Sequence, residues 1–160
     1  MSKSQVLDIL KNLDFPKNTS RQNIFRGKQQ SYEGMVLGMV NARGLGKMMS
    51  KKTKMDKYKP LYESSKKLMK TRDPNFKFTS IQVNKNQRTA KHTDSRNVGE
   101  SYIVGLGNYS GGEILIYDED GKNPKKVDIK NKFVKFNGSK LPHETAPFKG
   151  QRYTLVYYKI

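Results

Sequence analysis

Cysteine is absent from the 160 residues of this chain, and histidine occurs only twice. Without cysteine there can be no disulfide framework, no thiolate zinc site and no cysteine nucleophile. Any metal ion must therefore be held by nitrogen and oxygen ligands.

Long apolar runs are absent as well. No stretch approaches the ~18 apolar residues of a membrane span, and polar residues occupy the first segment, where a secretory signal would need an apolar run. We therefore expect no membrane partner and an intracellular location, cytoplasmic or nuclear. The length suits one domain, since domains typically have ~100–150 residues, and we expect a monomer.

Acidic residues are scarce, with 14 against 32 lysines and arginines, so the net charge is +18. Ten of the basic residues fall between Lys47 and Arg72, where only Asp56 and Glu63 oppose them. Such a segment is typical of a surface that binds nucleic acid, because each neutralised phosphate releases condensed counterions. A solvated lysine face would have the same composition.

The first half of the chain has the periodicity of helices. Apolar residues at helical spacing after Ser4 predict a helix over residues 5–13, and Pro60 is placed to open a second one with Leu61, Ser65 and Leu68 on one face. Between them we expect a polar connection over 17–31, a short strand over 35–40 and a basic loop over 41–59.

The second half alternates with period two, which predicts short strands separated by turns. The expected strands are residues 76–83, 101–106, 113–117, 126–129, 133–136 and 152–158. Strands this short and this closely spaced favour a barrel or a jelly-roll sandwich. We predict an α+β, mainly β fold in a single domain, with a helical and basic segment over 1–75 packed on a β core over 76–160.

One group of residues in the β region indicates a metal site. His92 and Asp94 are two apart, so in an extended segment they face the same side, and His143, the only other histidine, can complete a triangle from a neighbouring strand. Two imidazoles and a carboxylate form the facial triad of non-haem Fe(II) oxygenases, which leaves three positions open. A hydrolytic zinc site is chemically possible with the same ligands.

A second pair follows nine residues after His143. Arg152 and Thr154 share a strand face by the same alternation. A guanidinium beside a hydroxyl is a good receptor for a carboxylate. A hydrolytic zinc site would not explain this pair.

Two runs around these residues resemble a known family. They comprise Asn84, Lys85, Asn86, Thr89, His92, Thr93, Asp94, Asn97, Gly99, Ser101 and residues 107–113, and later residues 141–145, Pro147, Phe148, Gly150 and residues 152–156. Residues 78–158 resemble the double-stranded β-helix core of Fe(II)/2-oxoglutarate-dependent dioxygenases. Within that superfamily the runs are most similar to the TET/JBP-like branch, which oxidises the methyl group of 5-methylcytosine or thymine in nucleic acid.

The resemblance implies a jelly-roll core and a set of roles. His92, Asp94 and His143 would bind Fe(II), while Arg152 and Thr154 would hold the far carboxylate of 2-oxoglutarate, which is consumed with O2. No catalytic residue beyond the metal ligands is implied. Asn84 is a further candidate for contact with the co-substrate.

The expected substrate is DNA or RNA. Substrate-binding candidates are Arg96, two residues beyond Asp94, and Lys51, Lys52 and Lys54 in the basic segment. A flipped base would need a stacking partner, for which we considered Phe25, Arg26 and Tyr32. The alternative is a protein side-chain hydroxylase of the prolyl type, with an acidic protein as substrate.

Overall fold

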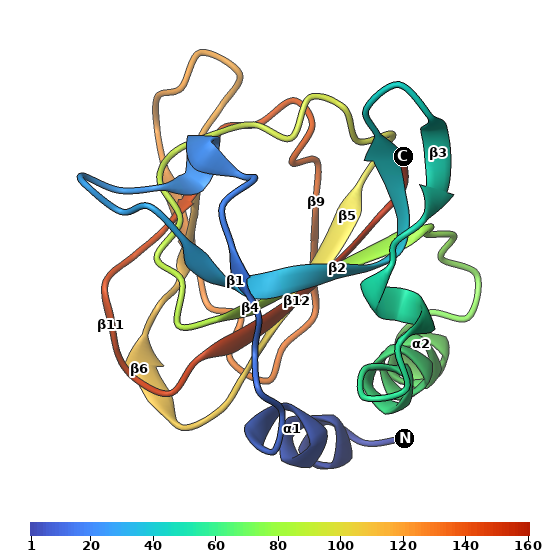
Figure 1. Cartoon of the computed structure of the whole chain (residues 1–160). Coiled ribbons are helices and arrows are strands. Elements are labelled where there is room, and N and C mark those ends of the chain that lie inside the picture. The colour runs from blue at the N-terminus through green and yellow to red at the C-terminus, as the bar shows by residue number, and fades with distance from the viewer.

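The computed structural model describes the whole chain, residues 1–160, and shows two helices beneath a mainly β body (Figure 1). The helices are α1 (Lys3–Lys11) and α2 (Lys59–Arg72), with single 3-10 turns η1 (Gln22–Ile24) and η2 (Lys52–Lys54). The strands are β1 (Lys17–Asn18), β2 (Tyr32–Ala42), β3 (Gly46–Met49), β4 (Ser80–Lys85), β5 (Ser101–Leu106), β6 (Tyr109–Gly111), β7 (Ile114–Ile116), β8 (Lys125–Val127), β9 (Val134–Phe136), β10 (His143–Thr145), β11 (Phe148–Gly150) and β12 (Tyr153–Tyr158). Neither helix combines the length and apolar character that crossing a bilayer requires.

Both predicted helices are present, with a shift at the first. Ser2, not Ser4, caps α1: its hydroxyl accepts from the Gln5 amide, and its own amide donates to the Gln5 side chain. This reciprocal cap starts the helix two residues earlier than its apolar spacing predicts. In α2, Pro60 occupies the first turn, and Leu61 and Leu68 are buried as expected.

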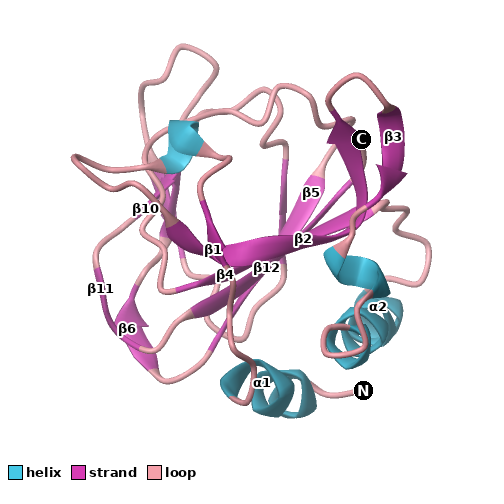
Figure 2. Ribbon diagram, viewed as in Figure 1, coloured by secondary structure: helices cyan, strands magenta, loops and turns pink.

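The body is built on one large antiparallel sheet with the order β1-β2-β4-β12-β5-β9, to which β3 adds by pairing with β2. Two smaller sheets, β10-β7-β8 and β11-β6, complete it (Figure 2). In the central strand β12, Thr154 pairs with Asn84 on one side and with Gly105 on the other. The predicted mainly β fold with helices packed on it is confirmed.

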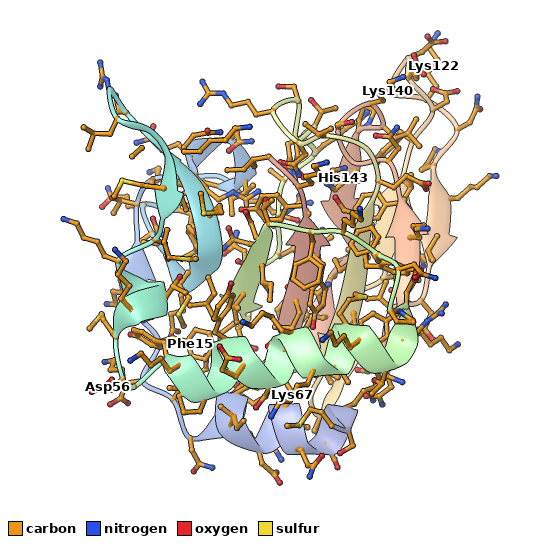
Figure 3. All side chains as sticks on the ribbon, turned by 90° about the vertical axis from the view of Figure 1, so that its right-hand side faces the viewer. Phe15, Asp56, Lys67, Lys122, Lys140 and His143 are labelled. Carbon is orange, nitrogen blue, oxygen red and sulfur yellow. The ribbon has the colours of Figure 1, made fainter.

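Alternation along β4 separates two faces of the large sheet. Ile81 and Val83 are fully buried in the cluster that includes the apolar residues of both helices. Gln82 and Asn84, which point the other way, line a cavity. In Figure 3, Lys67 lies on the helix layer at one end of the molecule, and His143 lies toward the opposite end. The helices and the cavity therefore lie on opposite faces.

The region expected to be a basic loop, residues 41–59, is largely ordered by backbone pairing. It holds the end of β2, all of β3 and η2. Gly38, at a φ of +95° where other residues are strained, bends β2. There its amide donates to the Thr53 hydroxyl and its carbonyl accepts from the Ser50 amide, both at 2.8 Å. Sequence patterns do not reveal such long-range hydrogen bonds. The prediction of a basic loop over residues 41–59 is therefore wrong.

Other expected boundaries also shift. The polar connection over 17–31 contains β1 and η1, and the strand expected over 76–83 begins only at Ser80. Phe76 and Phe78 instead pack edge-on against Tyr102 and Tyr157, with ring centroids 4.7 Å and 5.2 Å apart. Alternating aromatic residues thus served packing rather than strand pairing. The large sheet also takes β1, β2 and β3 from the part of the chain before residue 75.

Leu155, at the middle of β12, has no exposed surface and belongs to the main core. Leu155→Ala should lower the free energy of unfolding by ~2–5 kcal/mol, because it removes buried methyl groups and leaves a cavity. Urea denaturation measures this. Val98→Ala is the control, since this side chain is 55% exposed and its loss should cost less than ~0.5 kcal/mol. Equal effects of the two substitutions would contradict the assignment of this core.

Candidate metal centre

The two histidines are brought together by backbone hydrogen bonds. His92 lies in the loop after β4, and His143 is the first residue of β10. The His92 amide donates to the His143 carbonyl at 3.0 Å, and the His143 amide donates back at 2.9 Å. The Asp94 amide donates to the Gly138 carbonyl at 2.8 Å. The backbone therefore fixes all three predicted ligands.

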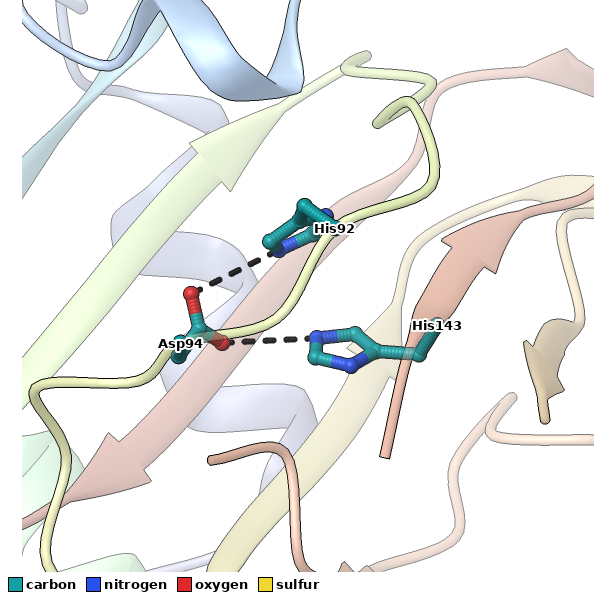
Figure 4. Close-up of side chains that lie close together, drawn as sticks. All are labelled: His92, Asp94 and His143. Atoms are coloured by element: carbon teal, nitrogen blue, oxygen red, sulfur yellow. Dashed lines mark ion pairs between the residues drawn. The ribbon is translucent and has the colours of Figure 1, made fainter. Parts of the chain in front are cut away.

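Their side chains converge as the spacing predicts (Figure 4). Asp94 Oδ1 lies 3.5 Å from His92 Nε2, and Asp94 Oδ2 lies 3.3 Å from His143 Nε2. One possible ligand atom from each of the three residues lies within 4.8 Å of the other two. These distances allow one ion to be shared by the three side chains.

The outer nitrogen of each imidazole faces a backbone carbonyl. His92 Nδ1 lies 2.7 Å from the Ala90 carbonyl oxygen, and His143 Nδ1 lies 2.8 Å from that of Leu141. A carbonyl only accepts, so each Nδ1 must carry the proton in the neutral ring. Each Nε2 then keeps its lone pair directed at the centre, which is the arrangement found in metal-binding histidines.

Asp94 is charged in this setting. Burial works to raise the pKa of Asp94, but in the metal-free site protonated His143 and His92 can donate to it from Nε2, and with the charge of Arg21 they hold this pKa well below its usual range. Arg21 Nη2 lies 3.3 Å from Asp94 Oδ1. The Asp94 carboxylate is thus an anionic ligand, and one of its oxygens is paired with the Arg21 guanidinium.

The centre opens into a cavity of about 160 Å³ between the large sheet and β10. Its apolar wall includes Ile103, Ile114 and Phe136. The remaining lining residues are Arg21, Val36, Gln82, Asn84, Gln87, Thr89, His92, Asp94, Asn97, His143, Thr145, Arg152, Thr154, Val156 and Tyr158. Burial raises the pKa of Tyr158 to about 12, against the lowering effect of Arg21, so this phenol is neutral.

Arg152 is a buried cation of this cavity that pairs with no carboxylate. It is 2% exposed, and its guanidinium donates only to carbonyls, to Gly112 at 2.9 Å and to Gln87 at 3.3 Å. Its Nε has no partner, nor has the buried hydroxyl of Tyr109 near it. Burial lowers the pKa of Arg152, while Tyr109 opposes the change. A buried cation without a counter-ion is costly unless a ligand anion neutralises it.

Gly112 makes room for this arginine. A Cβ at position 112 would lie 2.7 Å from Arg152 Nε, and its φ of +68° favours glycine. The guanidinium is also flanked by the rings of Tyr109 and Phe148, at 5.7 Å and 5.4 Å from the ring centroids. These contacts fix the direction of the cation.

A row of side-chain amides runs along the cavity wall next to this cation. Asn84 Nδ2 lies 3.4 Å from Thr154 Oγ1, and Gln82 Nε2 donates to Asn84 Oδ1 at 3.0 Å. Both amides are buried. The structure therefore places Asn84, Thr154 and Arg152 in one cavity with the three expected ligands.

The other candidates for substrate contact lie outside the cavity lining. These are Arg96, Lys51, Lys52 and Lys54. The considered stacking partners are engaged elsewhere. Tyr32 is 3% exposed and packs against Phe25, and Arg26 is bound to Glu144 at 2.6 Å.

Sequence reasoning missed Arg21 and Tyr158, and it named Asn97 only among the residues of the resemblance, without a role; all three line the cavity. Arg21 precedes Asp94 by 73 residues, and no spacing rule links the two positions. Tyr158 had a usable signal, because it continues the alternation of Thr154 along β12.

No protein-family model and no curated protein matches this sequence. Solved structures are similar in fold. An oxidoreductase of the 2OG-Fe(II) oxygenase family from Burkholderia pseudomallei aligns with a TM-score of 0.65 and 14% identity, over 97% of this chain and 76% of that chain. NgTET1 in complex with 5mC DNA aligns with a TM-score of 0.57 and 17% identity, over 79% and 60% respectively. A prolyl hydroxylase from Trichoplax adhaerens, in complex with a peptide fragment, aligns with a TM-score of 0.53 and 16% identity, over 98% and 75%. These likenesses confirm the predicted double-stranded β-helix fold and do not single out the TET/JBP-like branch.

Proposed function

We propose that this chain is an Fe(II)/2-oxoglutarate-dependent dioxygenase. The observation that carries the proposal is the pairing, within one cavity, of a converging His-Asp-His group with a buried arginine that has no counter-ion. A metal-only hydrolase would need the first feature and has no use for the second. A dioxygenase of this type needs both, because its co-substrate is a dicarboxylate.

The residues present fit the metal and the co-substrate. His92, Asp94 and His143 offer two neutral imidazole nitrogens and one carboxylate, a ligand set suited to Fe(II). Arg152 and Thr154 offer a guanidinium and a hydroxyl to an anion. When bound, Fe(II) and 2-oxoglutarate supply the oxidation of a C–H bond by O2, with 2-oxoglutarate converted to succinate and CO2.

The protein's own contribution is position and exclusion of water. Arg152 is held by two carbonyls and two rings, so it meets a carboxylate without reorganising. Asn84 keeps the Thr154 side chain in place from the neighbouring strand. Ile103, Ile114 and Phe136 contribute apolar surface to the cavity that holds the three ligands and Arg152, which favours a dry reaction space.

For the substrate, we propose the methyl group of a pyrimidine base in nucleic acid, of the 5-methylcytosine or thymine type. The net charge of +18 supports a polyanionic partner. Lys122 and Lys140 lie at the end of the molecule that carries His143, away from the helices (Figure 3). The solved NgTET1 structure, which is similar in fold, is a complex with 5mC DNA, and this supports the proposal.

Lys51, Lys52 and Lys54 have a different place in this proposal. Lys52 and Lys54 begin and end η2, and Lys51 directly precedes it; because η2 lies between β3 and α2, outside the cavity lining, these lysines would hold flanking phosphates rather than the reacting base. Changing all three to alanine should make the slope of log K against log[salt] shallower by up to ~2–3 units, if each residue contacts one phosphate. Fluorescence anisotropy with labelled DNA at several salt concentrations measures this slope.

The matched control changes three basic residues of α2, Lys66, Lys67 and Lys70, which lie on the helix layer away from the cavity. This variant has the same loss of charge and should keep the parental slope. An unchanged slope in the η2 variant would show that its lysines form a solvated surface.

The proposed substrate class is tested by product analysis. The protein is incubated with Fe(II), 2-oxoglutarate and O2, and with DNA, RNA or a peptide mixture, and mass spectrometry then searches for an added oxygen. Hydroxymethyl pyrimidine nucleosides would support the proposal. Hydroxylated peptides with unmodified nucleosides would establish the prolyl-type alternative, and failure to form any succinate would refute the dioxygenase assignment.

A further inference from the structure

Residues 17–26, here called the N-terminal strap, place Arg21 in the cavity lining and are fixed to the rest of the protein at three points. β1 pairs with the start of β2, Lys17 opposite Glu33. Ile24 is fully buried, and its carbonyl accepts from the Ala90 amide at 2.9 Å. At the end of the strap, Arg26 forms an ion pair with Glu144, which neighbours His143 in the sequence. Arg21, between these ties, is therefore held in a fixed place.

Arg21 meets only one of the two oxygens of Asp94. Each oxygen faces one imidazole, Oδ1 at 3.5 Å from His92 Nε2 and Oδ2 at 3.3 Å from His143 Nε2, but only Oδ1 is also 3.3 Å from Arg21 Nη2. The side chain of Arg21 is 26% exposed and that of Asp94 is 21% exposed, so the contact is partly screened from water. A guanidinium has donors only, so it fixes the orientation of a carboxylate without competing for the metal.

We propose that Arg21 is a positioning residue that keeps Asp94 bound to the metal through Oδ2 alone. This inference rests on the proposed function. A carboxylate can bind a metal through one oxygen or through both, and binding through both would consume a further coordination position. With Oδ1 engaged by Arg21, one oxygen remains for the ion.

The number of open positions matters for this chemistry. A facial triad on an octahedral ion leaves three positions, and a chelating 2-oxoglutarate with O2 needs all three. An Asp94 that bound through both oxygens would leave two. The strap therefore supplies a residue on which the reaction depends, although it lies outside the segment that carries the ligands.

The test counts the water molecules on a bound ion. Mn(II) is added to the protein without co-substrate, and enhanced relaxation of water protons reports how many exchangeable waters the ion carries. In Arg21→Ala the waters should fall from three to two, which lowers the enhancement per bound ion by about one-third. Arg21→Lys restores a cationic donor group and should recover most of the loss.

Arg43→Ala is the matched control, since it removes the same charge from an exposed position outside the cavity, and it should leave the enhancement unchanged. Thermal unfolding of each variant is recorded. If Arg21→Ala unfolds, Arg21→Met keeps the aliphatic length while removing the donors, and the same decrease is expected.

The outcomes separate this inference from the proposed metal site. If His92→Ala abolishes Mn(II) binding while Arg21→Ala and Arg21→Met bind with the parental enhancement, the site stands and the role of Arg21 is refuted. If His92→Ala binds Mn(II) as the parent does, the metal site itself is refuted and the inference falls with it.

Discussion

Alanine at His92 or at Asp94 should abolish Fe(II)-dependent formation of succinate. Each substitution removes one of three ligands, and the loss of metal affinity should exceed the ~10–100-fold that follows from removing an outer partner of a ligand. The fold should survive, because both side chains face the cavity rather than the main core. Succinate is measured by mass spectrometry at saturating 2-oxoglutarate, and the fold is checked by circular dichroism.

Ser95→Ala is the control for the alanine variants of His92 and Asp94. Ser95 follows Asp94 directly, but it is exposed and does not line the cavity. This variant should retain parental turnover and metal binding. Full turnover in either ligand variant would rule out the proposed centre, since the chain has no third histidine to replace the lost one.

Arg152→Ala should raise the concentration of 2-oxoglutarate needed for half-maximal turnover by roughly two to three and a half orders of magnitude. The estimate follows from the ~3–5 kcal/mol cost of leaving a buried charge without its partner, at 1.4 kcal/mol for each factor of ten. Arg152→Lys should recover only part of this, because an ammonium has no planar fork and could not reach both carbonyls. Titration of 2-oxoglutarate against succinate formation gives the values.

Direct binding measurements complete this experiment. Isothermal titration of 2-oxoglutarate into the metal-loaded protein should show the same loss of affinity in Arg152→Ala. Lys149→Ala, an exposed change on β11, should bind as the parent does. A parental 2-oxoglutarate requirement in Arg152→Ala would mean that another cation of the cavity anchors the co-substrate, and Arg21 would be the first to examine.

The sequence predicted the metal ligands because the rule that links them is local. His92 and Asp94 share a face through the two-residue period of an extended chain, and His143 was the only other histidine. Arg152 and Thr154 followed from the same period. Arg21 could not be found in this way, because its contact with Asp94, 73 residues later, depends on where the tertiary fold places the strap.

Among the strands that the sequence did not reveal, β6, β10 and β11 have three residues each. Three residues are too few for alternation to be recognised, and these strands are defined by pairing with distant segments, β10 with β7 and β11 with β6. The basic segment was a different case. Its charge was evident, but α2 turns half of it to the face opposite the cavity, and composition carries no information about faces.

The pair of backbone hydrogen bonds between His92 and His143 joins two segments that are 51 residues apart in the chain. An ion bound by the same two residues would be a cross-link at that junction, in a chain that has no cysteine to make one. Because such an ion binds the folded state alone, it would oppose local opening of the loop after β4 and of β10 together. Resistance to proteolysis in these two segments would then follow the supply of iron.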